Sequence, residues 1–290
     1  MKTIDDDGED QFLVTKEYKR FREFCEACIR YKYIGLCYGP PGVGKTLSAK
    51  YYSRWGLIEE YSRLDYQRSQ PTKPVPYELK EHDTIFYTAE VANSPSRILS
   101  SLNACVNKVQ QVRYDAKFCQ SVKEKEYQES EYNHKRIEDY INHLSNPFIK
   151  LLIIDESDRL KLTSLEQIRD YYDQKDCGLI LIGMPGMEKK LSRYAQLYSR
   201  VGFVHEFKPL SKDEMLFIMS NYLTKFGINI DPKDFTDHET IAAIMQATRH
   251  NFRLLNRLLK QIERIMKVNM VNTITKEIVL AARECLVIGI

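Results

Sequence analysis

The residues best suited to chemistry form a glycine-rich segment, GPPGVGKT, at positions 39–46. The segment fits the phosphate-binding pattern G-x-x-x-x-G-K-[ST]. Its glycines let backbone N–H groups close around phosphate oxygens, and a helix that begins here adds partial positive charge. We expect Lys45 to bridge the β- and γ-phosphates of ATP, and the Thr46 hydroxyl to ligate Mg²⁺. The expected nucleotide-binding residues are Gly39, Pro40, Pro41, Gly42, Val43, Gly44, Lys45, Thr46, Leu47 and Asp155.

Two carboxylates form a second candidate for chemistry. Asp155 and Glu156 directly follow the apolar run LLII at 151–154. If that run is a buried strand, both side chains stand at the sheet edge where ligands bind in such folds. We expect Asp155 to hold Mg²⁺ through water and Glu156 to act as the general base that polarises the attacking water. Many strands end in acidic residues, so this pair is informative only together with the glycine-rich segment.

Both motifs need elements that bring them together, and the hydrophobic pattern predicts an α/β fold. Strands alternating with helical patterns predict a mostly parallel sheet that is covered on both faces. A glycine loop that merely packs a helix onto a sheet is the alternative at 39–46, but the flanking strand and helix favour phosphate binding. Strands are predicted at 33–38, 84–88, 150–154, 178–183 and 202–207, and helices at 14–30, 44–55 and within 96–143.

The pattern changes after Pro209, where strand signals stop. Ser211 with Glu214, and Thr236 with Glu239, fit the capping box that begins a helix. We therefore predict a flexible acidic tail, a P-loop α/β domain and a small all-helical lid domain, at residues 1–13, 14–209 and 210–290. The lid helices are predicted at 211–226, 237–247, 251–268 and 275–286.

Composition excludes several classes of protein. The 43 basic and 40 acidic residues give a net charge of +3, so the chain is no polycation. Apolar runs are too short to span a membrane, and the acidic N-terminus is unlike a signal peptide. Seven scattered cysteines favour reduced thiols in a cytoplasm over a disulfide framework. Cys25 and Cys28 form a lone CxxC, which fits one amphipathic helix better than half of a zinc site.

Two charged segments differ in character. Residues 123–139 mix both signs and predict a solvated helix or an extended arm. Residues 249–267 instead hold six basic residues and one acidic residue, Glu263. Their spacing places the basic side chains on one helical stripe, which fits either an anionic target or solvent. The members of this basic stripe are Arg249, Arg253, Arg257, Lys260, Arg264 and Lys267.

The two motifs and the helical C-terminal region together resemble an AAA+ ATPase, in which GPPGVGKT and LLIIDESDRL are Walker A and Walker B. The resemblance implies that a neighbouring subunit supplies an arginine finger, for which Arg200 is the first candidate and Arg193 the alternative. It also implies that Arg253 reaches the γ-phosphate as sensor 2. The sensor 1 position departs from the family, because Met184 stands where a polar residue is usual. Slow or partner-dependent hydrolysis is therefore expected.

Within AAA+ proteins, three runs resemble the transposition regulators TniB, TnsC and MuB: IDESDRL at 154–160, GLILIGMPGMEKKLSRYAQLYSRVGF at 178–203, and FRLLNRLL at 252–259. The resemblance implies a homo-oligomer (a ring, spiral or filament) on duplex DNA, contacted through its phosphate backbone without sequence choice. It also implies a transposase and a target-selection protein as partners. The matching DNA-binding candidates are Ser96, Arg97 and Lys117. The alternative for these residues is ordinary surface charge.

Two other functions fit the same motifs. One is a replication initiator or helicase loader, which would associate with a helicase rather than a transposase. The other is a nucleotide-gated scaffold switch that never contacts DNA. Binding to duplex DNA that depends on salt and ATP would separate the last from the first two.

Overall fold

The fold is described from a computed structural model, which covers residues 12–65, 75–122, 149–224, 228 and 234–286. Within those ranges, the side chains of 63–65, 117–122, 235 and 236 are not described. The described part comprises two compact units. One contains the residues up to Arg20, Pro40–Gly44 and the chain from Phe207 onward, and the other contains Phe21–Gly39 and Lys45–Glu206. In the described residues, no helix is both long and apolar enough to cross a lipid bilayer.

Five parallel strands form the sheet of the second unit, in the order β2-β3-β4-β1-β5. Every residue of β3 and β4 is buried, because both faces of a parallel sheet are covered and the strands are apolar apart from Asp155 at the end of β3. β1 lies between β4 and β5, so the helices after β1 and β4 leave on opposite faces, and ligands of such sheets bind beside the carboxyl ends at this point. The strands are β1 (Ile34–Tyr38), β2 (Thr84–Thr88), β3 (Leu151–Asp155), β4 (Gly178–Gly183) and β5 (Val201–Glu206).

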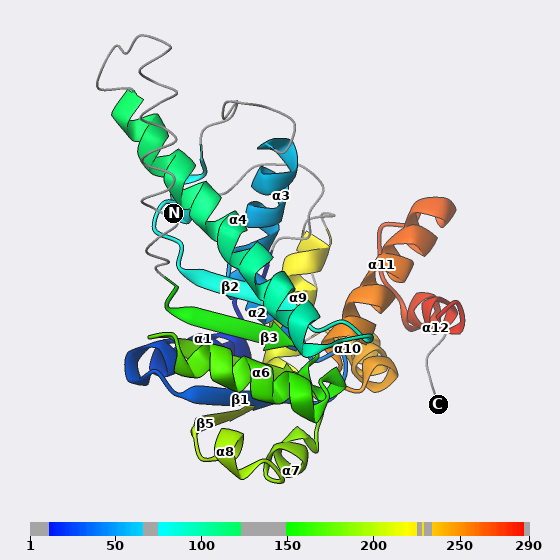
Figure 1. The fold of residues 1–290 in the computed structure, drawn as a ribbon. Helices are drawn as coiled ribbons and strands as arrows, with labels where there is room; N and C mark the ends of the chain where they lie inside the picture. The colour runs from blue at the N-terminus through cyan, green and yellow to red at the C-terminus, as the bar shows by residue number, and fades with distance from the viewer. Residues whose placement is uncertain (1–11, 66–74, 123–148, 225–227, 229–233, 287–290) are drawn as a thin grey trace. The chain divides into compact units, whose positions relative to one another are not determined.

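Helices cover both faces of this sheet. Crossovers between parallel strands are right-handed, so the helices that follow β2, β3 and β4 share one face and those that follow β1 take the other. Figure 1 shows α4 and α6 across the near face. The helices of this unit are α1 (Lys16–Tyr31, shared with the first unit), α2 (Lys45–Tyr52), α3 (Trp55–Asp65), α4 (Pro95–Val122), α6 (Leu162–Asp173), α7 (Met187–Leu191) and α8 (Ala195–Tyr198), with 3-10 turns η1 (Tyr77–Leu79) and η2 (Ser157–Arg159).

Helix α1 rests directly on the sheet at two glycines. A Cβ at Gly35 would lie 2.5 Å from the Cys28 sulfur, and one at Gly178 would lie 2.6 Å from the Cys28 carbonyl oxygen. Cys25 and Cys28 are both buried in this packing. The described residues contain no group of three metal-ligating side chains, and the CxxC pair lies on one helix as predicted.

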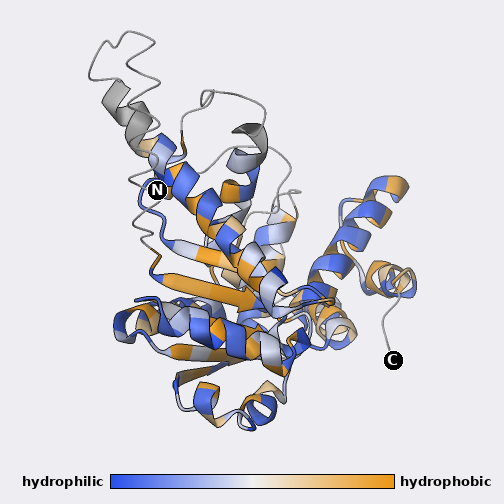
Figure 2. Ribbon diagram, viewed as in Figure 1, coloured by the Kyte–Doolittle hydropathy of each residue, from blue (hydrophilic) through white to orange (hydrophobic). Residues whose placement is uncertain are grey.

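The C-terminal helices of the first unit enclose a core of their own. The predicted apolar stripe of α11 is confirmed: Leu255, Leu258, Leu259, Ile262 and Met266 are all buried. Figure 2 shows the resulting alternation of orange and blue along α11, whereas β3 is mostly orange. This alternation is typical of a helix with one face in a core. The helices are α9 (Lys212–Thr224), α10 (Phe235–Thr248), α11 (Phe252–Asn269) and α12 (Lys276–Glu284).

Most of the predicted elements are present, and two predictions were wrong. The helix predicted at 44–55 ends earlier, at Tyr52, because Arg54 adopts a left-handed φ of 48°, and a separate helix that was not predicted, α3, begins at Trp55. The helix start predicted at 237 from Thr236 and Glu239 is also wrong. α10 already begins at Phe235, and the Asp234 side chain accepts the Asp237 N–H at 3.4 Å. The Ser211–Glu214 box is confirmed, with reciprocal bonds of 3.0 and 3.2 Å. The predicted arm at 123–139 and most of the acidic tail lie outside the described residues.

Candidate nucleotide site

Lys45 is the first residue of α2 and has little exposed surface, with 9% of its area accessible. Its ammonium donates to the Gly39 carbonyl at 2.6 Å. Burial lowers the pKa of Lys45, whereas Cys37, Asp155, Glu156 and Asp158 act in the opposite direction. The lysine is therefore a desolvated cation beside several acidic groups, and such a cation interacts strongly with a phosphate oxygen.

Thr46 and Asp155 meet as their motifs predicted. The Thr46 hydroxyl donates to Asp155 Oδ2 at 2.7 Å, although the two residues lie on α2 and at the end of β3. Asp155 is 2% exposed, and its Oδ1 accepts the Glu156 N–H at 2.9 Å. A hydroxyl and a carboxylate at this separation offer the hard oxygen ligands that Mg²⁺ prefers, with the remaining ligands coming from water and phosphate.

Glu156 has a strained backbone. Its φ and ψ are 54° and 35°, in the left-handed region that non-glycine residues rarely adopt. Holding such a conformation costs about 1–3 kcal/mol, and such residues cluster at functional sites. The Glu156 carboxylate is 37% exposed and forms an ion pair of 3.4 Å with Arg159. The left-handed backbone therefore determines the direction in which the half-exposed Glu156 side chain points from the end of β3.

The middle of the glycine-rich segment, Pro40–Gly44, is held by the start of α11 in the first unit. Asn251 caps that helix through its Oδ1, which accepts the Leu254 N–H at 3.2 Å, and its Nδ2 donates to the Pro41 carbonyl at 2.8 Å. The Arg253 N–H donates to the Gly42 carbonyl at 2.9 Å. Gly42 has a φ of 81°, so its carbonyl and amide adopt directions that only glycine allows without strain.

The other predicted nucleotide-binding residues occupy the same turn. Gly39 and Val43 are buried, Gly44 has a φ of 109°, and Leu47 is 45% exposed on the first turn of α2. The predicted strand, glycine turn and helix therefore follow one another as the phosphate-binding pattern requires.

Comparison with known proteins identifies the family. Residues 29–191 match the family described as an AAA domain, which is more than half of the chain. The chain belongs to the AAA family. A Staphylococcus aureus relative described as a potential ATP-binding protein is 45% identical over 283 residues, which cover 96% of this AAA chain and 97% of the relative.

Solved AAA structures share the fold at low sequence identity. The Holliday junction branch migration motor RuvB of Thermotoga maritima has a TM-score of 0.54 and 18% identity, and the match covers 94% of this chain and 70% of RuvB. The Aeropyrum pernix Orc1 protein, solved in complex with DNA, has a TM-score of 0.55 and 20% identity, with coverages of 92% and 64%. At these identities the likeness concerns the AAA fold alone.

The two arginine-finger candidates of this AAA chain differ in their surroundings. Arg200 precedes β5, and its guanidinium binds both oxygens of Asp173 on α6, at 2.7 and 2.9 Å. Arg193 is exposed and has no side-chain partner among the described residues. Arg200 directly precedes β5, and its carbonyl accepts the N–H of Ile34 at the start of β1, so it lies at the edge of the sheet opposite to the one where Asp155 ends its strand. Arg193 instead follows α7, whose Lys190 donates to the Asp158 and Leu160 carbonyls.

The sensor 1 position has a polar neighbour that sequence reasoning missed. Met184, partly buried, follows β4 as predicted. A Cβ at the preceding Gly183 would lie 3.1 Å from Asp158 Oδ1. That oxygen is buried, and it has no hydrogen-bond partner among the described residues. Asp158 thus places a carboxylate oxygen without a hydrogen bond beside the sensor 1 position, where this chain has Met184 instead of a polar residue.

The three predicted DNA contacts all belong to α4. Ser96 and Arg97 are exposed in its first turn, and Arg97 forms an ion pair of 2.7 Å with Glu90. Lys117 is on the same helix, but its side chain lies outside the described residues. Ser96 and Arg97 therefore share one surface, and Lys117 is several turns away along α4.

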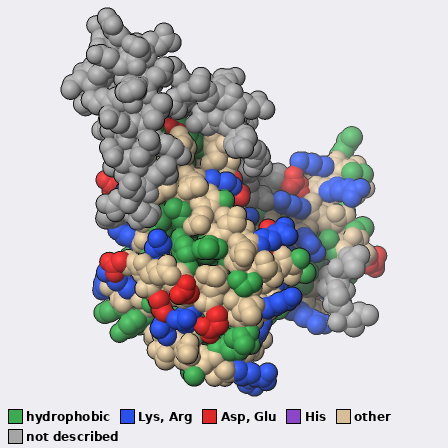
Figure 3. All heavy atoms as spheres, viewed as in Figure 1, with side chains coloured by type: hydrophobic (Ala, Val, Ile, Leu, Met, Phe, Trp, Pro, Cys, Tyr) green, Lys and Arg blue, Asp and Glu red, His purple; other side chains and the backbone are tan. Residues whose placement is uncertain are grey.

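Five members of the basic stripe, Arg253, Arg257, Lys260, Arg264 and Lys267, lie on α11 and are exposed. The prediction was wrong for Arg249, which precedes the helix in a turn with a left-handed φ of 47°. The stripe's one acidic neighbour, Glu263, is engaged by Lys267 at 2.6 Å and by the Tyr222 hydroxyl at 2.8 Å. Figure 3 shows Lys and Arg side chains gathered along this helix. Arg253 is also the residue whose backbone N–H donates to the Gly42 carbonyl. One end of the basic stripe therefore lies next to the glycine-rich segment.

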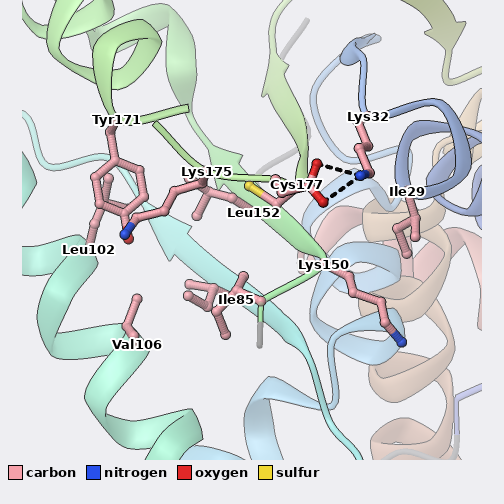
Figure 4. A pocket seen from close by; sticks show the side chains of 12 residues that line it. Ile29, Lys32, Ile85, Leu102, Val106, Lys150, Leu152, Tyr171, Lys175 and Cys177 are labelled. Carbon is pink, nitrogen blue, oxygen red and sulfur yellow. Dashed lines mark hydrogen bonds and ion pairs between the residues drawn. The ribbon is translucent and has the colours of Figure 1, made fainter. Parts of the chain in front are cut away.

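A cavity of about 400 Å³ lies at the opposite edge of the sheet (Figure 4). It is bordered by Ile85 and Leu152, the second residues of β2 and β3, and by Cys177 before β4. Two of its lysines are already paired, Lys32 with Asp176 and Lys150 with Asp83. The cavity therefore shares no residue with the nucleotide site.

Proposed function

We propose that this AAA protein is an ATP-dependent, DNA-binding ATPase that regulates transposition. It would oligomerise on target duplex DNA and recruit or activate a transposase, with a target-selection protein as a further partner. The observation that carries the ATPase part is the meeting of Thr46 and Asp155 at 2.7 Å, beside the desolvated Lys45. The described cysteines are free thiols, which fits a reducing cytoplasm.

The nucleotide chemistry follows from these side chains. Backbone amides of the glycine-rich turn would receive the phosphate oxygens, and Lys45 would exchange its bond to the Gly39 carbonyl for one to the γ-phosphate. Glu156 would accept a proton from the attacking water, as a general base placed by its strained backbone. Asp158 would provide a polar contact near the sensor 1 position.

Mg²⁺ fits the site through Thr46 and Asp155. Their two oxygens face each other, and one or two carboxylates with phosphates and water form the usual Mg²⁺ environment. The ion would neutralise charge on the β- and γ-phosphate oxygens. Replacing Thr46 by valine would remove the hydroxyl ligand without changing the size of the side chain.

Residues 14–209 would act as the ATPase domain and residues 210–290 as a lid. Asn251 and Arg253 support this assignment, because both bind backbone carbonyls of the glycine-rich segment. Arg253 would also reach the γ-phosphate through its side chain. A nucleotide bound in the glycine-rich turn would then act on the first turn of α11 through these two contacts.

The oligomer would be completed by an arginine from a neighbouring subunit. The place of Arg200 at the amino end of β5, opposite to the edge that holds Asp155, supports an action in trans for this arginine, with Arg193 as the alternative. Arg200 must give up its bidentate bond to Asp173 before it can act, whereas Arg193 is available in the isolated chain. A bond from Arg200 to the ATP of the neighbouring subunit would compensate for the loss of the Asp173 bond, and ATP would thereby link the two subunits.

DNA binding is supported by two exposed basic surfaces, the start of α4 and the stripe of α11. Contacts to phosphates give affinity without sequence choice, which suits a protein that accepts many target sites. Ser96 and Arg97 are the proposed contacts on α4, together with Lys117.

The test is the assembly of DNA-bound oligomers, observed by electron microscopy and by gel shift with ATP or ADP. Lys45→Ala should abolish the oligomers, because the phosphate contact is lost. Glu156→Gln should prolong them, because nucleotide binding remains while hydrolysis falls by about 10² or more. Lys50→Ala, on the exposed side of the same helix, is the matched control and should behave as wild type.

Wild-type behaviour of both variants would contradict the proposal. ATP-dependent assembly that copurifies with a helicase would favour a loader, and ATP binding without salt-dependent DNA binding would favour a scaffold switch.

A further inference from the structure

The cavity at the amino edge of the sheet has apolar walls. Ile85 of β2, Leu152 of β3, and Leu102 and Val106 of α4 border it, and all four side chains are buried. Its volume of about 400 Å³ lies in the range of pockets that hold small molecules. Protein interiors pack closely and leave few voids larger than a water molecule, so a cavity of this size can receive a ligand.

Two polar side chains meet beside these walls. Tyr171 lies in the last turn of α6, and Lys175 follows the end of that helix. Both residues line the cavity. The Lys175 ammonium lies 5.6 Å from the centre of the Tyr171 ring, and Figure 4 shows the lysine side chain extending toward this tyrosine. A cationic donor and a hydroxyl donor therefore stand together next to an apolar surface.

Both donors are available for a ligand. Neither the Lys175 ammonium nor the Tyr171 hydroxyl has a hydrogen-bond acceptor or an acidic partner in the part of the chain that the structure describes. A tyrosine that is largely shielded from solvent usually has a partner for its hydroxyl. Burial raises the pKa of Tyr171, so the phenol keeps its proton at neutral pH and remains a donor.

The other titratable groups of the lining leave the cavity positively charged. Lys32 and Lys150 are each paired with a carboxylate, the first with Asp176, which is the one acidic residue in the described lining. Burial raises the pKa of the Cys177 thiol to about 11, so this side chain is neutral at pH 7.5. The uncompensated charge is therefore that of Lys175, and it favours an anionic ligand.

We propose that the cavity binds a small amphipathic carboxylate, with its apolar body on the aliphatic walls and its head group beside Lys175 and Tyr171. The ammonium and the hydroxyl both donate to the carboxylate oxygens, and hydrogen bonds between charged groups are stronger than neutral ones. A cationic ligand of the same shape would meet the Lys175 charge without a counter-ion. This site goes beyond the proposed function, because it shares no residue with the nucleotide site.

The experiment titrates the full-length chain with octanoate and measures the dissociation constant by isothermal titration calorimetry. Octan-1-ol and octylammonium have the same alkyl chain and serve as the uncharged and the cationic comparison. Octanoate should bind at one site per chain and at least about ten-fold more tightly than octylammonium, with octan-1-ol between them. Equal or tighter binding of octylammonium would overturn the proposal.

Two variants test the head-group contacts. Lys175→Gln should weaken octanoate binding about ten-fold and leave octan-1-ol binding unchanged, because only the charged bond is lost. Tyr171→Phe should weaken octanoate binding by about three- to ten-fold. Neither change removes a hydrogen bond within the described chain, so both variants should fold. Lys161→Gln, at the other end of α6, is the matched control and should bind octanoate as the wild type does.

A third variant and ATP test the location. Val106→Phe should weaken octanoate and octan-1-ol alike, because the larger side chain fills part of the cavity; if this variant fails to fold, Lys175→Gln still decides. Saturating ATP should leave the octanoate affinity unchanged, since the nucleotide site lies at the opposite edge of the sheet. Competition by ATP would place the carboxylate at the glycine-rich segment and overturn the proposal. Equal octanoate affinity in the wild type and in Lys175→Gln would overturn it as well.

Discussion

At the scale of single residues, the nucleotide site depends on Gly42 more than its small size suggests. Its φ is 81°, and a Cβ at this position would lie 2.5 Å from Asn251 Oδ1, so there is no room for a side chain. Left-handed backbone costs about 1–2 kcal/mol in alanine. Gly42→Ala should therefore weaken binding of a fluorescent ATP analogue by roughly ten-fold or more.

Gly56→Ala is the control for this substitution. Gly56 lies in α3, and a Cβ there would meet no atom within 4 Å. Alanine should raise the free energy of unfolding by about 0.5–1 kcal/mol and leave nucleotide affinity unchanged. Equal nucleotide affinity in the two variants would show that the Gly42 conformation is not needed.

The thiols give a second prediction at this scale. Burial raises the pKa of Cys28 from 9.0 to about 12, and it raises the pKa values of Cys105 and Cys177 to about 11. Only the thiolate reacts with iodoacetamide, so these side chains should react slowly at pH 8, while the exposed Cys285 reacts first. Peptide mapping by mass spectrometry measures each rate.

The same shifts predict how stability depends on alkaline pH. Each folded thiol keeps its proton above the pH at which the unfolded chain releases it. The stability that results is fully present below pH 9 and is lost progressively as pH rises toward 11–12. Urea unfolding at pH 8 and pH 10 should show the decrease, and a flat profile would contradict the burial of these thiols.

At the scale of elements, one helix cap has two tasks. Asn251 both begins α11 and holds Pro41, whereas Thr275 caps α12 through the Ile278 N–H and has no contact with the glycine-rich segment among the described residues. Asn251→Ala and Thr275→Ala should each cost about 1 kcal/mol of stability. Only Asn251→Ala should also weaken ATP binding, as measured by calorimetry. Equal affinities would mean that the Pro41 bond does not position the turn.

Sequence predicted the strands better than the contacts between them. The five strands were predicted within a residue of their ends, because buried parallel strands are continuous apolar runs bounded by polar residues. The break at Arg54 was missed, since SRW at 53–55 contains neither glycine nor proline. The Asp234 cap was missed because Thr236 with Glu239 fits the same pattern two residues later.

The same difference holds within the site. Lys45, Thr46, Asp155 and Glu156 came from motifs with fixed spacing, and the contact of Thr46 with Asp155 agrees with the roles assigned to them. The contacts of Asn251 with Pro41 and of Arg159 with Glu156, and the pairing of Arg200 with Asp173, had no sequence signal. Each depends on which segments lie side by side in three dimensions, and that depends on strand order.

At the scale of the whole molecule, a net charge of +3 conceals the separation of charge onto local surfaces. If the stripe of α11 contacts phosphates, each contact adds about 0.9 to the slope of log affinity against log salt. Arg257→Gln with Arg264→Gln should lower that slope by roughly two. Fluorescence anisotropy of a labelled duplex, titrated at several salt concentrations with ATP present, measures it.

The control for this pair removes two charges elsewhere. Lys19→Gln with Arg22→Gln alters exposed residues of α1 and should leave the slope unchanged. An equal decrease in both double variants would point to net charge alone, and would contradict a specific phosphate contact by α11.

The bond from the Arg253 amide to the Gly42 carbonyl has a consequence for timing. Because that proton cannot exchange with heavy water while the bond is intact, its exchange rate counts how often the turn and the helix separate. Bound ATP should lower the exchange rate of the Arg253 amide, and bound ADP should allow a faster exchange. This single amide would then report on the nucleotide cycle without a fluorescent probe.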